Sequence, residues 1–83
     1  MNLKVLRKPE VLATTGWSRS TLHVRIKENL FVPPISLGER AIGFLAHETD
    51  AVLAAMISGK SKEQIKALVA SLVAQRKNEG ATQ

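Results

Sequence analysis

The second half of the chain repeats apolar side chains at the spacing of an amphipathic helix. Within residues 47–58 the repeat consists of Thr49, Val52, Leu53, Met56 and Ile57. These are the i, i+3, i+4, i+7 and i+8 positions that share one helix face. We therefore expect a helix over residues 47–58 that buries this stripe, ended by a glycine at position 59.

A second amphipathic stripe follows, made of Ile65, Leu68, Val69, Leu72 and Val73. It is preceded by Ser61 and Gln64, whose side chains can each satisfy a backbone N–H in a capping box. The pattern predicts a helix from residue 61 to about residue 77. Residues 79–83 are expected to form a frayed tail, as chain ends commonly do.

The first half of the chain predicts two shorter helices. Pro9 suits a helix start and Gly16 a helix end, which gives a helix over residues 9–15. Ser18 is a natural N-cap for the next helix, expected over residues 19–28. Two short helices joined by the tight turn at 15–18 are typical of a helix-turn-helix. We expect Trp17 to bury its ring where the two helices meet.

An extended segment begins at the prolines of positions 33 and 34, which forbid helix. Residues 35–37 and 41–44 alternate as short strands, and Gly38-Glu39-Arg40 forms the turn between them. A hairpin directly after a helix-turn-helix is a wing. The sequence thus predicts an α+β, mostly helical winged helix-turn-helix with about four helices and one short β-hairpin. Residues 1–60 would form this domain, and residues 61–83 a helix that packs on it or contacts another protein.

Charge adds an expectation about the partner. The chain has 83 residues, 12 Lys and Arg against 7 Asp and Glu, and a formal net charge of +5. Residues 1–45 carry seven basic and three acidic side chains, whereas residues 46–83 carry five and four. An anionic partner such as nucleic acid should therefore meet the N-terminal half.

Other classes of function find no support in the composition. Cysteine is absent, and the two histidines, His23 and His47, have no ligand-spacing motif beside them. We expect no metal, no cofactor and no enzymatic activity. The sequence also lacks a run of 18 apolar residues and a secretory signal, which predicts a soluble cytoplasmic protein without membrane contact.

Several runs of sequence resemble one family. They are Leu6-Arg7-Lys8-Pro9-Glu10-Val11, Thr15-Gly16-Trp17-Ser18-Arg19-Ser20-Thr21-Leu22, Phe31-Val32-Pro33-Pro34, Leu37-Gly38-Glu39-Arg40-Ala41-Ile42-Gly43-Phe44, and Glu48 with Asp50-Ala51. Over about residues 4–58 the chain is similar to the AlpA/excisionase group. The resemblance implies a MerR-like winged helix and a role as a prophage or mobile-element transcription regulator, or as an excisionase that steers an integrase. Thr49 and Val52 depart from it, because they stand where the family commonly has an aliphatic residue and a tryptophan.

The residues that would contact double-stranded DNA follow from the second helix, which we interpret as the recognition helix. Side chains on its outer face can reach base edges, with Arg the strongest reader of guanine. Thr21 and Lys27 are better suited to phosphates, Arg7 and Lys8 are further phosphate contacts, and Arg40 at the wing tip can enter a minor groove. The predicted DNA-binding set is Arg7, Lys8, Arg19, Ser20, Thr21, His23, Val24, Lys27 and Arg40.

One alternative stays open at this point. A helix-turn-helix scaffold can serve as a protein-interaction module that modulates a partner without reading DNA. The long C-terminal helix favours this interpretation. Its length of about 25 Å is more than is needed to cover the core of so small a domain. In either case we expect this helix to be partly buried and to contact a second copy or an integrase.

Overall fold

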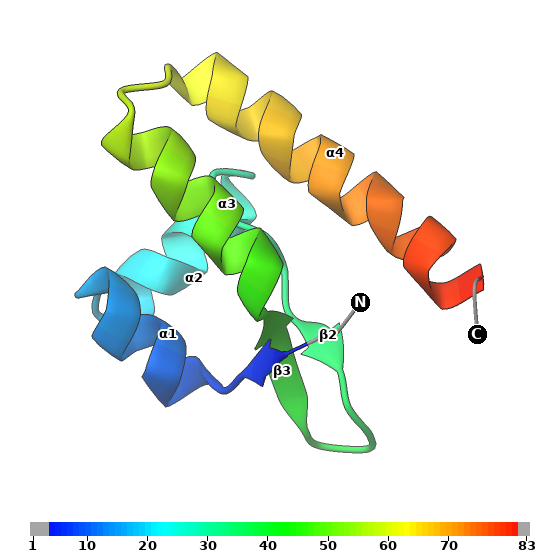
Figure 1. The fold of residues 1–83 in the computed structure, drawn as a ribbon. Helices are drawn as coiled ribbons and strands as arrows, with labels where there is room; N and C mark the ends of the chain where they lie inside the picture. The colour runs from blue at the N-terminus through cyan, green and yellow to red at the C-terminus, as the bar shows by residue number, and fades with distance from the viewer. Residues whose placement is uncertain (1–3, 82–83) are drawn as a thin grey trace.

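The computed structural model describes residues 4–81, with side chains described as far as Arg76. The elements in chain order are β1 (Val5–Leu6), α1 (Lys8–Thr15), α2 (Arg19–Lys27), β2 (Ile35–Ser36), β3 (Ile42–Leu45), α3 (Ala46–Ile57) and α4 (Lys62–Ala81). Figure 1 shows α3 running through the middle of the molecule, with α1 and α2 to one side of it, the sheet at one end and α4 across the opposite side. The α+β, mostly helical fold predicted from the sequence is confirmed.

The helix-turn-helix is built from the caps that the sequence predicts. Gly16 adopts a φ of 75°, and its N–H donates to the carbonyl of Leu12. Ser18 then accepts a hydrogen bond of 3.2 Å from the backbone N–H of Thr21 and so starts α2. The turn between the two helices is short because Gly16 ends α1 in the left-handed region and Ser18, two residues later, already caps α2.

Asn29 ends α2 in a way that directs the chain into the core. Its φ of 63° is in the left-handed region, which asparagine tolerates better than most residues. The N–H of Leu30 returns to the carbonyl of Arg25 at 2.8 Å. The chain then turns inward, so that Leu30, Phe31 and Val32 are all buried.

A three-stranded antiparallel sheet contains one strand more than the predicted hairpin. β3 lies in the centre, with β2 on one side in the register Ile35↔Gly43 and β1 on the other in the register Val5↔Leu45. The hairpin was predicted, with strand ends that differ by one residue. β1 was missed because two residues are too few to show an alternation of apolar and polar side chains.

Aromatic rings form the centre of the core. The rings of Phe31 and Phe44 lie 6.0 Å apart, and Trp17 meets Phe31 edge to face at 5.5 Å. Trp17 is half-buried rather than buried as expected. Its outer face is covered by the guanidinium of Arg25, 5.3 Å from the ring centroid. The junction of the two helices is therefore closed by a cation–π contact as well as by apolar packing.

The predicted stripe of α3 is buried only in its first two turns. Thr49 and Val52 are fully buried, whereas Ile57 is 87% exposed, so the expectation that Ile57 packs in the core is wrong. The physical reason is that Ile57 is the last residue of α3 and lies at the edge of the stripe, whereas Met56, one residue earlier, still packs against the core. Thr49 replaces the aliphatic side chain that the family resemblance implies, and its buried hydroxyl has no hydrogen-bond partner among the described residues.

Helix α4 packs along α3 through the stripe read from the sequence. Ile65, Val69 and Leu72 are buried members of the core. Both hydrogen bonds of the predicted capping box between Ser61 and Gln64 are present, at 2.9 and 3.2 Å. The expected tail is wrong for residues 79–81, which continue the helix because no proline interrupts it; residues 82–83 lie outside the described range. Within residues 4–81, no helix is both long and apolar enough to cross a membrane.

A buried ion pair fixes the position of α4. Glu48 on α3 is fully buried, and both of its carboxylate oxygens accept hydrogen bonds from Arg76 of α4, from Nε at 2.8 Å and from Nη2 at 2.5 Å. The same Nη2 also donates to the carbonyl of Pro33 at 2.8 Å. The Glu48–Arg76 pair therefore joins α4, α3 and the segment that leads into the hairpin.

Truncating Arg76 should destabilise the domain strongly. Arg76→Ala leaves the Glu48 carboxylate buried without a partner, which typically costs about 3–5 kcal/mol. A domain of this size has a total free energy of unfolding of about 4–12 kcal/mol. We expect urea unfolding followed by circular dichroism to show a large loss of stability or an unfolded chain.

Two controls separate this cause from a general sensitivity of α4. Gln75→Ala removes an exposed neighbour on the same helix and should change stability by less than about 0.5 kcal/mol. The double variant Glu48→Met/Arg76→Met should recover most of the loss, since an apolar pair can replace a buried ion pair. Equal unfolding midpoints for Arg76→Ala and Gln75→Ala would refute the role assigned to the pair.

Candidate functional site

The exposed side chains of α2 lie on one continuous face. At 3.6 residues per turn, Arg19, Ser20, His23, Val24 and Lys27 fall within an arc of roughly 140° around the helix axis. All five are exposed, and Val24 is unusual among apolar residues in keeping 49% of its surface accessible. The face therefore offers two cations, an imidazole, a hydroxyl and an apolar group to a partner.

The opposite side of α2 is fixed to the core. Leu22 is buried, Ile26 is half-buried, and both pack with the aromatic rings. The half-buried Arg25 lies over the ring of Trp17 and so packs against the domain. Because the inner side is held in this way, the outer face has a defined orientation relative to the rest of the molecule.

A hollow of about 240 Å³ lies beside α2, where the helix meets α1 and the hairpin. Two elements supply its basic lining residues. Lys8 comes from α1, and Arg19 and His23 come from α2. Ile42, the first residue of β3, keeps 40% of its surface exposed. The full lining is Lys8, Arg19, Leu22, His23, Ile26, Pro34, Ile42 and Phe44. The hollow therefore places Arg19 and His23 of α2 beside Lys8 of α1 and Ile42 of the hairpin.

A second hollow, of about 350 Å³, lies on the other flank of α2. It is lined by Thr21, Val24, Arg25, Glu28, Leu30 and Lys62. Thr21 is half-buried, and its hydroxyl accepts a hydrogen bond of 3.0 Å from Ser18, so this residue also helps to cap the helix. Lys62 belongs to α4 and brings a positive charge next to α2 from the far end of the chain.

The remaining predicted residues are exposed but line neither hollow. Arg40 lies in the hairpin turn, where the N–H of Leu37 donates to the carbonyl of Ala41 at 2.8 Å. Arg7 precedes α1, and its backbone N–H donates to the carboxylate of Glu10 at 2.9 Å. Ser20 and Lys27 are exposed on α2 itself.

Sequence reasoning missed three residues around α2. Pro34 and Ile42 line the hollow next to the wing, and Lys62 lines the one on the opposite flank. Strand alternation puts Ile42 on the same face as Phe44, which lines the same hollow, but only the packing of the hairpin brings this face beside α2. No local pattern could have placed Lys62 beside α2, because this contact depends on how α4 packs.

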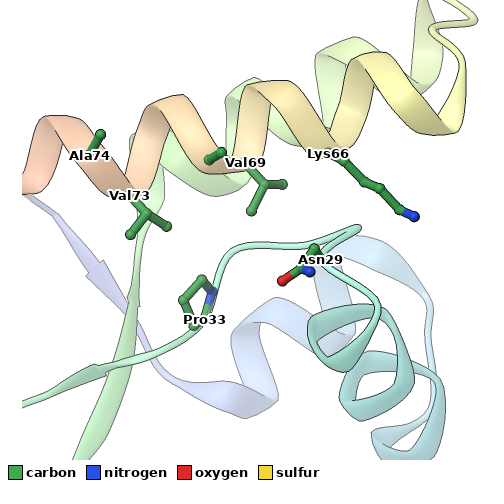
Figure 2. A pocket seen from close by; sticks show the side chains of 7 residues that line it. Asn29, Pro33, Lys66, Val69, Val73 and Ala74 are labelled. Carbon is green, nitrogen blue, oxygen red and sulfur yellow. The ribbon is translucent and has the colours of Figure 1, made fainter.

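A third groove, with a volume of about 620 Å³, runs between α4 and the segment that follows α2. Figure 2 shows Val69 and Val73 of α4 facing Pro33 across it, with Lys66 at the end nearest Asn29. The lining contains no carboxylate and no histidine. In the part of the chain that the structure describes, no three His, Asp or Glu side chains gather where they could hold a metal ion.

Comparisons with known proteins identify one family and one relative. The family model described as "Prophage CP4-57 regulatory protein (AlpA)" matches residues 4–54. The chain is also 37% identical over 59 residues to an uncharacterized protein, ORF88, of Enterobacteria phage P4; the alignment covers 71% of this chain and 67% of that protein. No solved structure matches at a significant level. The family match ends within α3, so α4 lies outside it.

Gly43 allows the hairpin and β1 to approach closely, and replacing it should disturb both. A Cβ at this position would clash with the side chain of Val5 and come within 2.9 Å of Leu37 Cδ1. Gly43→Ala should therefore cost about 1–3 kcal/mol through overpacking. Thermal unfolding followed by circular dichroism measures the loss.

A second substitution tests the cause of that loss. Val5→Ala removes the side chain that the new Cβ would meet first, so the double variant Gly43→Ala/Val5→Ala should be less destabilised than the sum of the two single variants. Strict additivity would show that the approach of β1 is not what requires glycine at this position.

Proposed function

The chain belongs to the AlpA family of prophage regulatory proteins, and we propose that it acts by sequence-specific binding to double-stranded DNA. The observation that carries the proposal is the hollow in which Lys8, Arg19 and Ile42 meet. There Arg19 and His23, at one edge of the exposed face of α2, lie beside a residue of the hairpin, on a helix whose inner side packs in the core. That is the arrangement a recognition helix and a wing need to engage one duplex together.

In this proposal α2 enters the major groove, which is wide enough for one helix. Arg19 at the first turn reads guanine through paired hydrogen bonds, and Ser20 and His23 add weaker contacts to base edges. The exposed methyl groups of Val24 suit a thymine methyl. Lys27 and Thr21 contact phosphates, which fixes the register of the helix without reading sequence.

Elements next to α2 would hold the DNA backbone. Lys8, which lines the same hollow as Arg19, and Arg7, one residue before it, contact phosphates on the side of the wing. Arg40, exposed in the hairpin turn, reaches the minor groove, where a narrow groove attracts arginine. In this proposal each of these residues contacts DNA, and none is assigned a catalytic role.

The biological roles consistent with the family are control of a prophage or mobile-element promoter and assistance to an integrase during excision. Either role can include self-association or an integrase contact through α4. The alternative is a module that modulates a partner protein without reading DNA. The exposed Ile57 and the groove along α4 favour it, whereas the cationic face of α2 would then have no function.

Selection of bound duplexes from a random pool, followed by a salt titration, tests DNA binding itself. We expect an enriched sequence motif. If about four phosphates are contacted, a plot of log K against log salt should fall with a slope near −3.6. A protein that selects no duplex, or whose binding is insensitive to salt, would leave the interaction module as the better account. Footprinting of the element's attachment site and of its integrase promoter then separates excision from promoter control.

Arg19→Ala should weaken binding to the selected duplex by about 1–3 kcal/mol and have a smaller effect on random duplex. Lys27→Ala is the matched control on the same helix, because loss of a phosphate contact weakens both duplexes equally. Fluorescence anisotropy with the two duplexes gives the ratio of the affinities. If Arg19→Ala leaves that ratio unchanged, the arginine does not read a base.

A further inference from the structure

Lys62 is a cation beside α2 that the family match does not include. It is the first residue of α4, and it lines the hollow formed by Thr21, Val24 and Glu28 on the flank of α2 away from the wing. The matched segment ends at residue 54, so this lysine is supplied by a part of the chain that the family resemblance does not describe.

The charge of Lys62 is neither paired within the described part of the fold nor favoured by its position in α4. A cation in the first turn of a helix is disfavoured by the helix dipole. Ser61 and Gln64 already cap α4 through two hydrogen bonds. Among the described residues, no carboxylate is paired with Lys62, and its side chain is exposed. A charge that is unfavourable for the helix, unpaired and exposed is available for an external anion.

The other charges in this hollow leave that role to Lys62. Arg25 is held over the ring of Trp17, and Glu28 carries a negative charge that would repel a phosphate. The formal charges of Arg25 and Glu28 cancel. Within the lining of this hollow, Lys62 therefore supplies the net positive charge.

We propose that Lys62 binds a backbone phosphate of DNA on the flank of α2 opposite the wing, so that α4 is a third element of the DNA interface. The inference rests on the proposed function. A helix in the major groove lies between two phosphate backbones. Lys8 serves the backbone on the side of the wing, and Lys62 is placed to serve the other.

The test compares Lys62→Ala with Lys66→Ala in the full chain. Lys66 carries the same charge on the same helix, but it lines the groove with Asn29 and Pro33 and no residue of α2 (Figure 2). Affinity for the selected duplex and for a random duplex is measured by fluorescence anisotropy. The salt concentration is varied from about 0.05 to about 0.3 M, a range over which phosphate contacts change affinity strongly. Thermal unfolding of each variant is recorded alongside.

Lys62→Ala should weaken binding to both duplexes roughly eightfold at 0.1 M salt and reduce the salt slope by about 0.9, the value for one lost phosphate contact. Its melting temperature should be unchanged or slightly higher, because the substitution removes a cation from a helix N-terminus. Lys66→Ala should have a clearly smaller effect on affinity and slope.

The outcomes distinguish this inference from the proposed function. Absence of salt-dependent duplex binding by the unsubstituted protein overturns the proposed function, and the inference with it. Normal binding that Lys62→Ala leaves intact overturns the inference alone. Equal losses from Lys62→Ala and Lys66→Ala would also overturn it, since the effect would then come from net charge and not from the position beside α2.

Discussion

The bidentate pair between Glu48 and Arg76 is the interaction on which the arrangement of the whole domain depends. The apolar stripe of α4 makes helix packing favourable, but apolar contacts alone leave the helix free to slide or rotate by small amounts. A buried carboxylate with two hydrogen bonds to one guanidinium permits a single register. The third hydrogen bond, to the carbonyl of Pro33, extends that register to the segment from which the hairpin begins.

The position of α2 follows from a second constraint, the route of the chain at both ends of this helix. Ser18 caps its start, and Asn29 turns the chain so that Phe31 enters the core and meets Trp17. The helix is therefore held at its two ends and along its inner side. The side chains of its outer face do not pack in the core. Core packing therefore does not determine which residues stand there, and a binding partner can. Preorganisation of this kind lowers the entropy lost on binding.

Most of the architecture could be predicted from sequence because its signals are local. Glycines with positive φ, a serine N-cap, a capping box and apolar repeats each depend on a few neighbouring residues, and Gly16, Ser18 and the stripe of α4 behaved as these rules predict. The features that escaped prediction depend on residues far apart in the chain. β1 exists because β3 offers it an edge, and Glu48 looks like an ordinary exposed helix residue until Arg76, 28 residues later, is placed beside it.

The same distinction applies to the candidate site. The residues of α2 could be chosen from helical spacing, whereas their neighbours could not, because Ile42 and Lys62 reach α2 only through tertiary packing. Counting charges by halves of the chain was a coarse guide for the same reason. Arg25 belongs to the basic N-terminal half but covers Trp17, and Lys62 belongs to the nearly neutral half but lies beside α2.

The segment that matches the family is shorter than the part of the chain that forms the core. The family match ends at residue 54, inside α3. That segment contains Glu48 but lacks Arg76 and the buried α4 side chains Ile65, Val69 and Leu72, which belong to the same apolar cluster as Phe31 and Phe44. In this chain α4 completes the core on which α2 and the hairpin pack, because it supplies three buried apolar side chains and the partner of Glu48.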